Sequence, residues 1–454
     1  MLWNWIKNRM LNYPKTRIYE NGVYLTYEDI VVYAENFSKL LTEPCYGIYC
    51  KSELMTGIAI LACFAAEKTA VPVSFKYGEI FCKQIFEFVE PEYIIDDFSG
   101  NLKIVEIIGQ KYQNPDEAPA LIMCTSGTSG TPKGVMLSEE NILSNIKGIQ
   151  NYFHLTPEDK ILILRSLHHC AVLTGEFLIS LINGTEIHFC ENSYDIRNCV
   201  NTIESKEISV ICGTPTYFNM LNKTIKRPLK LKKVAVSGEC LTSEVASNIR
   251  KLFPIAEIYH VYGLTEASPR VAYLSPSCFD IAKGFLNHFL ENIEHKIVDD
   301  FTNEVAAGEC GELWIKGNNI MMGYFKNPQS SNEKMQNGWL KTGDIAFQNT
   351  EGFIKILGRK DDMIIYAGMN IYPSEIENAL KKDSRVEDVI AYGIPHNDYG
   401  QVIGVKVKGN FSNTSEVLDI TKQYLPTYAR PHHIEIVKEL KKNASGKTIR
   451  RRNS

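Results

Sequence analysis

The sequence predicts a layered α/β protein with a large N-terminal domain and a small α+β C-terminal domain. Its 454 residues exceed what one hydrophobic core usually holds, so at least two domains are expected. Short β-rich apolar runs alternate with amphipathic segments of helix length, as in proteins whose helices cover a sheet. These runs lie at residues 46–49, 120–123, 210–212 and 233–236.

The longest apolar stretch covers residues 56–66 and is followed at once by Glu67 and Lys68. It is too short to span a bilayer, so we expect a buried helix. The first ten residues mix tryptophan with basic side chains, but they lack the apolar core and small-residue cleavage site of a secretion signal. We therefore expect a cytoplasmic protein with no membrane span.

The pattern changes after residue 294 to short strands with glycine-rich turns, as in residues 308–317. This change predicts an antiparallel β subdomain. After Gly358 the sequence indicates a strand and turn, a helix near residues 374–381, further strands and a basic tail. We expect an N-terminal domain of residues 1–360 and a C-terminal domain of residues 361–454, which is within the usual size of a domain.

The composition is that of an ordinary globular protein without a dominant charge. Hydrophobic residues make up 44% and charged residues 22%, and the formal net charge is -4. No global field would gather nucleic acid or an anionic membrane, so neither is an expected partner. The 12 cysteines include no Cys-x-x-Cys pair, which argues against a zinc ribbon or a disulfide framework. We expect reduced, structural thiols, Cys124 and Cys170 included.

The most informative segment is residues 121–134, an apolar strand running into a loop of glycines and hydroxyls that ends in a lysine. Glycines permit close backbone approach, amides and hydroxyls donate to phosphate oxygens, and a lysine supplies a cation. The spacing is not that of a Walker loop, because Lys133 follows a proline. The candidate ATP-binding residues here are Thr125, Ser126, Gly127, Thr128, Ser129, Gly130 and Lys133.

This segment resembles the phosphate-loop signature of the adenylate-forming (ANL) superfamily. That superfamily contains acyl- and aryl-CoA synthetases, the adenylation domains of nonribosomal peptide synthetases, and luciferases. Ser129 stands where a threonine is more usual, and both side chains are hydroxyls. The resemblance implies a ligase that uses ATP and Mg²⁺ to convert a carboxylic acid into an acyl-adenylate and then passes the acyl group to a thiol.

The second match is Tyr262-Gly-Leu-Thr-Glu266, preceded by Gly238 and Glu239. The resemblance implies that Tyr262 stacks on adenine, with Gly238 and Glu239 along the adenine edge. It further implies that Thr265 touches the α-phosphate and that Glu266 holds Mg²⁺, so both count as catalytic. A single carboxylate suits Mg²⁺, which completes its shell with phosphate oxygens and water. Taken alone, the same pattern is typical of a turn and helix start.

Two further matches follow in the superfamily's order. In residues 339–344 the resemblance implies that Asp344 binds the ribose hydroxyls, although a Gly-Asp pair is also typical of a β-turn. In residues 358–377 it implies that Arg359 contacts ribose or phosphate and that Asp361 is a hinge for a mobile C-terminal domain. The residues around Gly368 would line the path by which a thiol-bearing arm enters. Residues 373–377 also read as an ordinary helix start.

The last match is Asn-Ala-Ser-Gly-Lys at residues 443–447. By the resemblance, Lys447 bridges the substrate carboxylate and the α-phosphate, and rotation about Asp361 later withdraws it and brings the Gly368 segment to the site. The chemistry needs no nucleophilic side chain, because positioning and preorganised charge stabilise the transferring phosphoryl group. A lysine near a polar tail is otherwise usually solvated.

Residues 165–176 resemble the segment that carries a His-His pair in luciferase-like and acyl-CoA-forming members. His168 and His169 are therefore candidates for the acyl pocket or its gate, and structural histidines are the equal alternative. Amino-acid-activating members place an aspartate here to bind the α-ammonium group, and residues 165–182 contain none. An aryl or aliphatic acid is favoured, although Glu176 keeps the amino-acid alternative open.

The chain ends at Ser454, just past the Lys447 motif, so we expect no fused carrier domain. The acceptor would then be CoA or a separate phosphopantetheinyl carrier protein, and CoA is the commoner acceptor among stand-alone members. The alternative is a stand-alone adenylation enzyme that serves a biosynthetic assembly line. A noncatalytic binding module would be expected to lack Glu266 or Lys447, and both are present.

Overall fold

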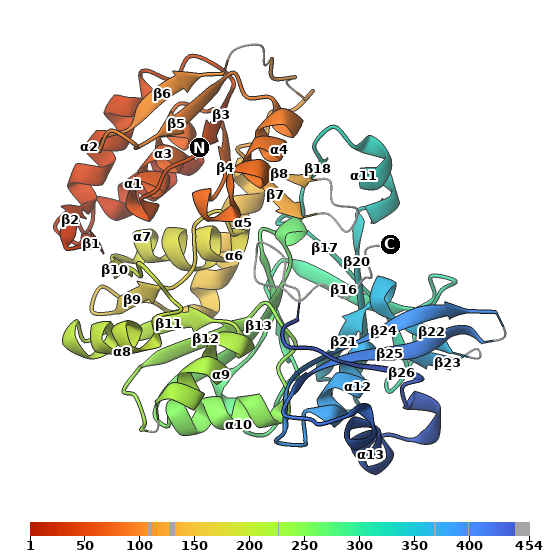
Figure 1. Cartoon of the computed structure of the whole chain (residues 1–454). Helices are drawn as coiled ribbons and strands as arrows, with labels where there is room; N and C mark the ends of the chain where they lie inside the picture. Colours follow the sequence, from red (N-terminus) through yellow and green to blue (C-terminus); the bar gives the residue numbers. More distant parts are fainter. Residues whose placement is uncertain are drawn as a thin grey trace. The chain divides into compact units, whose positions relative to one another are not determined.

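The computed structural model describes residues 1–107, 111–113, 115–126, 132–225, 227–366, 369–397 and 399–440; at 77, 81, 125, 126 and 370 it describes the backbone alone. The chain divides into two compact units (Figure 1). The first comprises Met1–His295 and Ile315–Leu340, and the second comprises Lys296–Trp314 and the chain from Lys341 on. The predicted α/β class is confirmed.

The larger sheet of the first unit has nine strands among the described residues, in the order β15-β14-β13-β12-β11-β9-β10-β1-β2. Its central strands pair in parallel and are buried on both faces, which explains their continuous apolar runs. The strands are β1 (Arg17–Glu20), β2 (Val23–Thr26), β9 (Lys160–Ile163), β10 (Glu186–Phe189), β11 (Val210–Gly213), β12 (Lys233–Ser237), β13 (Glu257–Gly263), β14 (Arg270–Leu274) and β15 (His288–Phe289).

The second sheet of this unit has seven strands in the described part of the chain, in the order β18-β8-β7-β4-β3-β5-β6. Strands β3, β4 and β7 pair in parallel, whereas β7 and β8 pair antiparallel. The strands are β3 (Cys45–Ile48), β4 (Thr69–Pro72), β5 (Tyr93–Asp96), β6 (Lys103–Glu106), β7 (Leu121–Ser126), β8 (Pro132–Leu137) and β18 (Gly323–Tyr324).

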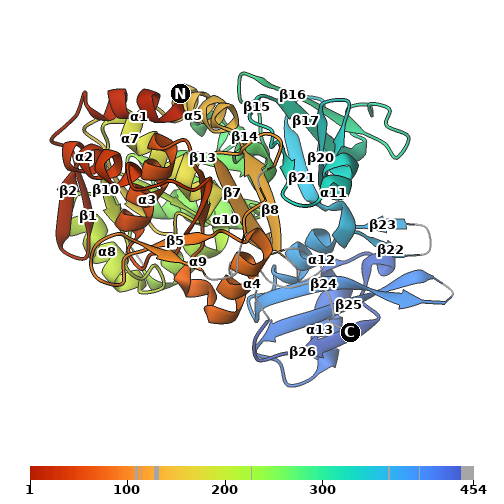
Figure 2. The same ribbon diagram turned by 90° about the horizontal axis from the view of Figure 1, so that it is seen from above.

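The predicted buried helix is α3 (Glu53–Ala65), which contacts β1 of one sheet and β3 and β4 of the other (Figures 1 and 2). It is apolar on nearly all sides because it packs between the two sheets. Ser52 begins the helix, since its side chain accepts a hydrogen bond from the backbone amide of Met55. In the part of the chain that the structure describes, no helix has both the length and the apolar character needed to cross a membrane.

Several other helices of the first unit begin at polar side chains that cap them, as in α2, α5, α8, α9, α10 and α11. Thr26 and Asp29 form a capping box at one helix, and Ser138 and Asn141 form another. The helices are α1 (Leu2–Met10), α2 (Tyr27–Ser38), α4 (Glu79–Val89), α5 (Glu139–Phe153), α6 (Cys170–Val172), α7 (Ile179–Asn183), α8 (Ile196–Ser205), α9 (Pro215–Thr224), α10 (Ser243–Leu252) and α11 (Pro328–Lys334). Short 3₁₀ turns are η1 (Phe75–Tyr77), η3 (Thr265–Ala267) and η4 (Pro276–Cys278), and η2 (Leu173–Leu178) is a π-helix.

From residue 293 the chain forms strands of 2 to 10 residues, so strands are present as the glycine-rich turns predict, but not all of them are short. Strand β20 pairs antiparallel with β19 and with β21, which confirms antiparallel structure in this region. The strands are β16 (Ile293–Val298), β17 (Cys310–Gly317), β19 (Met335–Gln336), β20 (Trp339–Gln348) and β21 (Ile354–Arg359).

The rest of the second unit is an α+β layer with its own core. A cluster of buried aliphatic side chains, from Ile364 to Ala429, packs between the sheet and two helices, α12 (Pro373–Leu380) and α13 (Thr414–Tyr424). The sheet contains β22 (Ile364–Tyr366), β23 (Met369–Ile371), β24 (Val386–His396), β25 (Gly400–Gly409) and β26 (His433–Ile436). Two 3₁₀ turns, η5 (Lys360–Asp362) and η6 (Thr427–Ala429), complete the elements described here.

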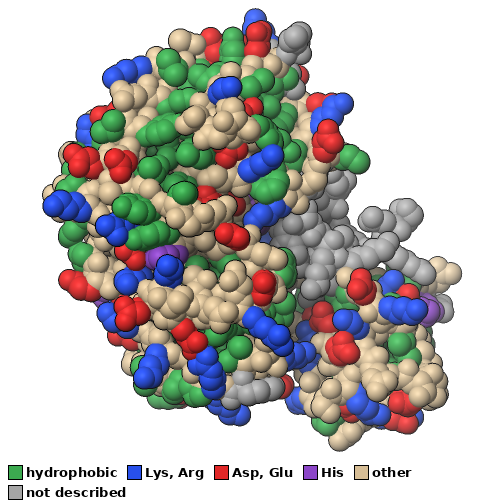
Figure 3. All heavy atoms as spheres, turned by 60° about the vertical axis from the view of Figure 1, so that its left-hand side comes forward, with side chains coloured by type: hydrophobic (Ala, Val, Ile, Leu, Met, Phe, Trp, Pro, Cys, Tyr) green, Lys and Arg blue, Asp and Glu red, His purple; other side chains and the backbone are tan. Residues whose placement is uncertain are grey.

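The distribution of charge on the surface and the state of the cysteines agree with what the composition predicts. Figure 3 shows acidic and basic side chains interspersed over the face that it presents, as the small net charge predicts. All 12 cysteines belong to the described residues, and each is a free thiol.

Candidate active site

The predicted phosphate segment is built on the β7–β8 pair. The two strands keep their antiparallel register up to Thr125 opposite Lys133 and Ser126 opposite Pro132. Lys133 therefore lies within a strand rather than at the end of a loop. The candidate residues Gly127, Thr128, Ser129 and Gly130 lie outside the described residues, as do the side chains of Thr125 and Ser126.

Lys133 and Glu266 both contact one tyrosine, Tyr324. The Lys133 Nζ lies 5.4 Å from the centroid of the Tyr324 ring, a cation–π distance. The Tyr324 hydroxyl donates a 2.8 Å hydrogen bond to Oε1 of Glu266. Tyr324 is buried and holds its place by pairing with Val135 of β8. The structure thus joins a cation of the phosphate segment to the predicted magnesium ligand.

The backbone that carries Glu266 is held by a turn that only glycine fits. A Cβ on Gly263 would lie 2.0 Å from the carbonyl oxygen of Pro269, so a larger residue would push β13 and the following segment apart. The carbonyl of Glu266 accepts a 2.9 Å hydrogen bond from the amide of Met321. Tyr262 lies at the end of β13 and is partly exposed, and Thr265 begins the short turn η3.

Gly238 and Glu239 follow directly on β12. Gly238 has a φ of +92°, a conformation that favours glycine, and a Cβ there would lie in ordinary contact with Thr214, 3.6 Å from its Cγ2. Glu239 accepts hydrogen bonds of 3.1 and 2.6 Å from the amide and hydroxyl of Thr216. The two predicted adenine-edge residues therefore lie at the carboxyl end of a parallel strand, where α/β proteins place their ligands.

His168 and His169 lie side by side, with ring centroids 4.1 Å apart. Burial, followed by the neighbouring His169 imidazole, lowers the pKa of His168 well below its usual range. Burial, followed by the charge of Arg165, lowers the pKa of His169 to about 3. Both rings are therefore neutral at neutral pH, and this agrees with the acyl-pocket and the structural interpretations alike.

Glu176, which left the amino-acid alternative open, is fully buried and forms a 2.9 Å ion pair with Arg165. A carboxylate already paired with a guanidinium is poorly placed to receive a substrate ammonium group.

Two predicted nucleotide-binding residues of the second unit are neighbours. Asp344 of β20 lies opposite Arg359 of β21, and an Arg359 Nη1 lies 3.3 Å from an Asp344 carboxylate oxygen. The same nitrogen donates to the carbonyl oxygen of Thr342 at 3.0 Å. Asp361 is exposed in the turn η5. Gly368 and Lys447 lie outside the described residues, so their predicted roles stay predictions.

Two residues that motif reasoning missed are Tyr324 and Thr216. Tyr324 follows a glycine in an unremarked stretch, and no spacing relates it to Lys133 or Glu266. Thr216 lies just after a proline that starts α9, a position that suggests only a helix start. Only the pairing of β18 with β8 and the packing of β11 against β12 bring these residues to the site.

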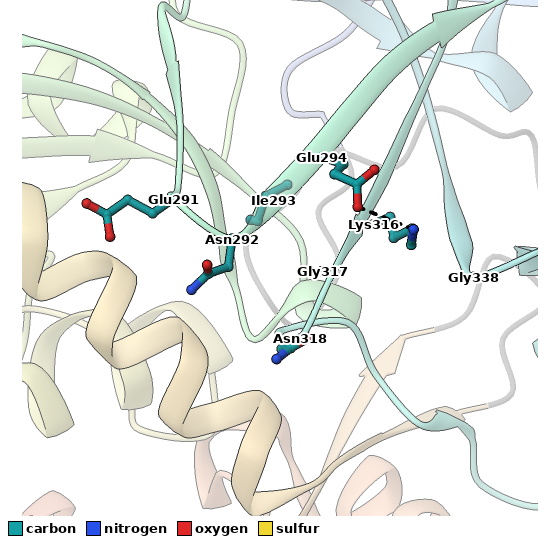
Figure 4. A pocket seen from close by; sticks show the side chains of 8 residues that line it. All are labelled: Glu291, Asn292, Ile293, Glu294, Lys316, Gly317, Asn318 and Gly338. Carbon is teal, nitrogen blue, oxygen red and sulfur yellow. Dashed lines mark ion pairs between the residues drawn. The ribbon is translucent and has the colours of Figure 1, made fainter.

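A surface cavity of about 560 Å³ lies elsewhere in the first unit (Figure 4). An ion pair of 3.3 Å between Lys316 and Glu294 lies at its wall. None of the predicted site residues lines this cavity, so it gives no support to a substrate site. Its lining residues are Glu291, Asn292, Ile293, Glu294, Lys316, Gly317, Asn318 and Gly338.

Comparison with known proteins gives a consistent result over nearly the whole chain. The family described as AMP-binding enzyme matches residues 6–325, and its C-terminal domain matches residues 375–447. A long-chain-fatty-acid–CoA ligase of Salmonella typhimurium is 32% identical over 81% of this chain and 68% of its own length. A ligase of the same name from Haemophilus influenzae is 30% identical over 93% of this chain and 76% of its own.

Solved structures show the same fold. The o-succinylbenzoate CoA synthetase of Bacillus subtilis, in complex with its acyl-adenylate intermediate, superimposes with a TM-score of 0.87 at 24% identity, covering 98% of this chain and 97% of that one. ATP-bound MatB from Rhodopseudomonas palustris gives 0.85 at 21% identity, covering 98% and 96%. Both domains of the family match this chain in order, and relatives with 30% identity or more span most of it. The chain therefore belongs to the AMP-binding enzyme family, which is the adenylate-forming superfamily.

Proposed function

We propose that this protein is an AMP-forming acid–CoA ligase that activates a carboxylic acid with ATP and Mg²⁺. The observation that carries the proposal is the contact chain from Lys133 through Tyr324 to Glu266. It places an ammonium group and a carboxylate next to the segment that resembles a phosphate loop. Curated relatives that share 30% identity or more with this chain are named as acyl-CoA ligases.

The residues present fit a magnesium nucleotide. Mg²⁺ bound with ATP needs only one or two protein carboxylates, because phosphate oxygens and water supply its other ligands. Glu266 is the proposed ligand, and its Oε1 is oriented by the Tyr324 hydroxyl. The bound ion would neutralise phosphate charge during the reaction.

The first half-reaction joins two anions. A carboxylate oxygen of the acid attacks the α-phosphorus of ATP, the bond to the β-phosphate oxygen breaks, and pyrophosphate leaves with its electron pair. We assign Lys133 to the β- and γ-phosphates, Thr265 to the α-phosphate, and Lys447 to the acid carboxylate and the α-phosphate. Preorganised cations and donors stabilise the charge that develops, so no covalent enzyme intermediate is needed.

The remaining nucleotide contacts are proposed from the resemblance of the motif residues to those of the superfamily. Tyr262 would stack on adenine, and Gly238 and Glu239 would border it. Asp344 would accept hydrogen bonds from the ribose hydroxyls, and its pairing with Arg359 supports this by holding the carboxylate in one orientation. Thr125, Ser126, Gly127, Thr128, Ser129 and Gly130 would donate to the phosphates.

The second half-reaction transfers the acyl group to sulfur. The thiol attacks the acyl carbon, the bond from that carbon to the adenylate oxygen breaks, and AMP leaves. We propose a C-terminal domain of residues 361–454 that turns about Asp361, removing Lys447 and bringing the Gly368 segment in. The separate aliphatic core between residues 364 and 436 supports a body able to move as one piece. The proposed boundary falls inside the second compact unit, after the β20–β21 pair.

CoA is the proposed acceptor, and a separate phosphopantetheinyl carrier protein is the second candidate. The curated relatives' names specify CoA. Free thiols throughout the chain support a reducing, cytoplasmic setting. The acid is proposed to be aryl or aliphatic without an α-amine, because Glu176 is occupied by Arg165. His168 and His169 are assigned to the acyl pocket or its gate.

The proposal is tested with purified protein, Mg²⁺ and ATP. Acid-dependent exchange of labelled pyrophosphate into ATP is expected across a panel of aryl, short-chain and long-chain acids, followed by thioester formation with CoA. Lys447→Ala should abolish exchange and leave transfer from preformed acyl-adenylate largely intact. Release of ADP in place of AMP, or no exchange with any acid, would overturn the proposal. Faster transfer to a carrier protein than to CoA would favour the second acceptor.

A further inference from the structure

Arg270 is a buried cation whose side chain forms no ion pair within the part of the chain that the structure describes. It begins β14 and is 3% exposed. Among the residues with described side chains, its Nε has no hydrogen-bond partner and no carboxylate lies within ion-pair distance of its guanidinium. Its backbone is fixed, since the side-chain amides of Asn145 and Asn319 both donate to the carbonyl oxygen of Arg270, at 2.7 and 3.2 Å. A buried guanidinium held in place but left unpaired is costly, unless a bound ligand completes its hydrogen bonds.

The fold makes room for this side chain. A Cβ on Gly175 would lie 2.8 Å from Nη2 and 2.9 Å from Nε of Arg270. The guanidinium therefore packs directly on the backbone of the π-helix η2, in the segment that is proposed to recognise the acid. Single turns of π-helix are frequent at functional sites. Any residue larger than glycine at position 175 would displace the guanidinium.

A second guanidinium lies on the same segment. Arg165 donates through Nη2 to Oε1 of Glu176 at 2.9 Å, while Oε2 of this fully buried carboxylate has no partner. Nη1 of Arg165 lies 4.0 Å from the position that a Cβ on Gly238 would occupy. Arg165 thus faces the segment after β12 that is proposed to border the nucleotide.

The three charged groups lie near one residue of the sheet, Cys212. The charges of Glu176, Arg270 and Arg165 all act on the thiol of Cys212 in β11. These three groups, two guanidinium groups and one carboxylate, together carry a net positive charge when Glu176 is ionised. Burial raises the pKa of Glu176, although the two arginines oppose this, and protonation of Glu176 would make the region more positive still.

We propose that Arg270 is a specificity-determining residue of the acid pocket, and that the activated acid carries a second anionic group, of the carboxylate class, which this guanidinium binds. The inference rests on the proposed function, since it concerns the same acid. An alkyl tail would leave the guanidinium buried and unpaired. An ammonium group would meet two like charges, and the only carboxylate of the cluster is already paired.

The experiment compares acids that differ in one charge. Pyrophosphate exchange is measured with aliphatic and aromatic dicarboxylic acids, with the monoamide of each, and with monocarboxylic acids of equal length. A monoamide keeps the shape of the diacid and removes one charge. For the best diacid we expect kcat/KM about 10- to 100-fold above that of its monoamide. The neutral amide would leave the Arg270 guanidinium without a charged partner, and an unpaired buried charge weakens binding of the transition state.

Variants assign the preference to Arg270. Arg270→Met should reduce the ratio of diacid to monoamide to about one, and Arg270→Lys should retain part of it. Glu176→Gln removes the opposing charge and should keep or increase the ratio. Lys251→Met, which removes an exposed cation of the same unit, is the matched control and should leave the ratio unchanged. Thermal melting of each variant separates loss of folding from loss of discrimination.

The outcomes separate the inference from the function on which it rests. Exchange that proceeds with monocarboxylic acids and shows no preference for diacids overturns the inference alone. So does a preference that survives in folded Arg270→Met. Exchange that is absent with every acid overturns the ligase function, and the inference with it.

Discussion

Tyr324→Phe isolates the hydrogen bond that orients Glu266. The substitution removes the hydroxyl that donates to Glu266 Oε1 at 2.8 Å, and it keeps the ring beneath the Lys133 ammonium group. The residue is buried, so the phenylalanine ring should stay where the tyrosine ring lies. We expect slower adenylation and a higher magnesium requirement, because the carboxylate loses the donor that fixes its orientation.

The magnitude follows from the kind of bond. A hydrogen bond to a charged group contributes about 1.5–3 kcal/mol. If the whole contribution is lost in the transition state, the rate of pyrophosphate exchange falls about 10- to 150-fold. Tyr324→Ala removes the ring as well, so a cation–π contribution of about 0.5–1 kcal/mol with Lys133 should be lost in addition.

The assay is pyrophosphate exchange at saturating acid, with ATP and Mg²⁺ varied independently. Tyr194→Phe is the matched control, because Tyr194 is 72% exposed and removal of its hydroxyl should change neither parameter. A Tyr324→Phe enzyme with the exchange rate and magnesium dependence of the parent would refute the reasoning, and Glu266 would then need no orientation by Tyr324.

Three further predictions concern other parts of the account. Gly263→Ala should reduce the free energy of unfolding by about 1–3 kcal/mol, because its Cβ would lie 2.0 Å from the Pro269 carbonyl oxygen; an unchanged urea midpoint would contradict this. The free energy of unfolding should fall as the pH decreases from 6.5 toward 3, because His169 takes up a proton in the unfolded chain but stays neutral when folded. His169→Gln should make this fall less steep. Parallel pH profiles of the two proteins would speak against a buried neutral His169. Asp361→Pro should spare pyrophosphate exchange and block thioester formation, and equal loss of both half-reactions would argue against a hinge there.

The fold was predictable from the sequence where the burial of a segment determines its pattern of apolar and polar residues. The continuous apolar run of α3 predicts a helix buried on all sides, and the structure places it between two sheets. The glycine-rich turns after residue 294 predict the antiparallel strands around β20. Such patterns are local, because each residue reports only whether its own side chain meets water or protein.

The sequence predicted individual residues of the site but not the contacts between them. Motifs identified Lys133, Glu266, Asp344 and Arg359 one by one, but no spacing indicated that Lys133 and Glu266 share a tyrosine. That contact depends on the pairing of β18 with β8, which joins segments far apart in the chain.

Arg270 illustrates the same limit more sharply. An arginine at the start of an apolar strand would ordinarily turn its charge to water. Its burial depends on Gly175, a glycine nearly a hundred positions earlier in the chain. In the sequence, nothing distinguishes Gly175 from any other small residue in a helical segment. Residues that contact only through tertiary packing carry no local pattern for sequence reasoning to use.

The acyl-adenylate route is tested most directly by following the oxygen atoms of the acid. The enzyme is given an acid labelled with oxygen-18 in its carboxyl group, together with ATP, Mg²⁺ and CoA, and the products are analysed by mass spectrometry. Attack of the carboxylate on the α-phosphorus, followed by thiol attack on the acyl carbon, must leave one labelled oxygen in AMP. Label in AMP is the predicted result. Unlabelled AMP, or label in inorganic phosphate, would contradict the acyl-adenylate route and the roles assigned to Glu266 and Lys447.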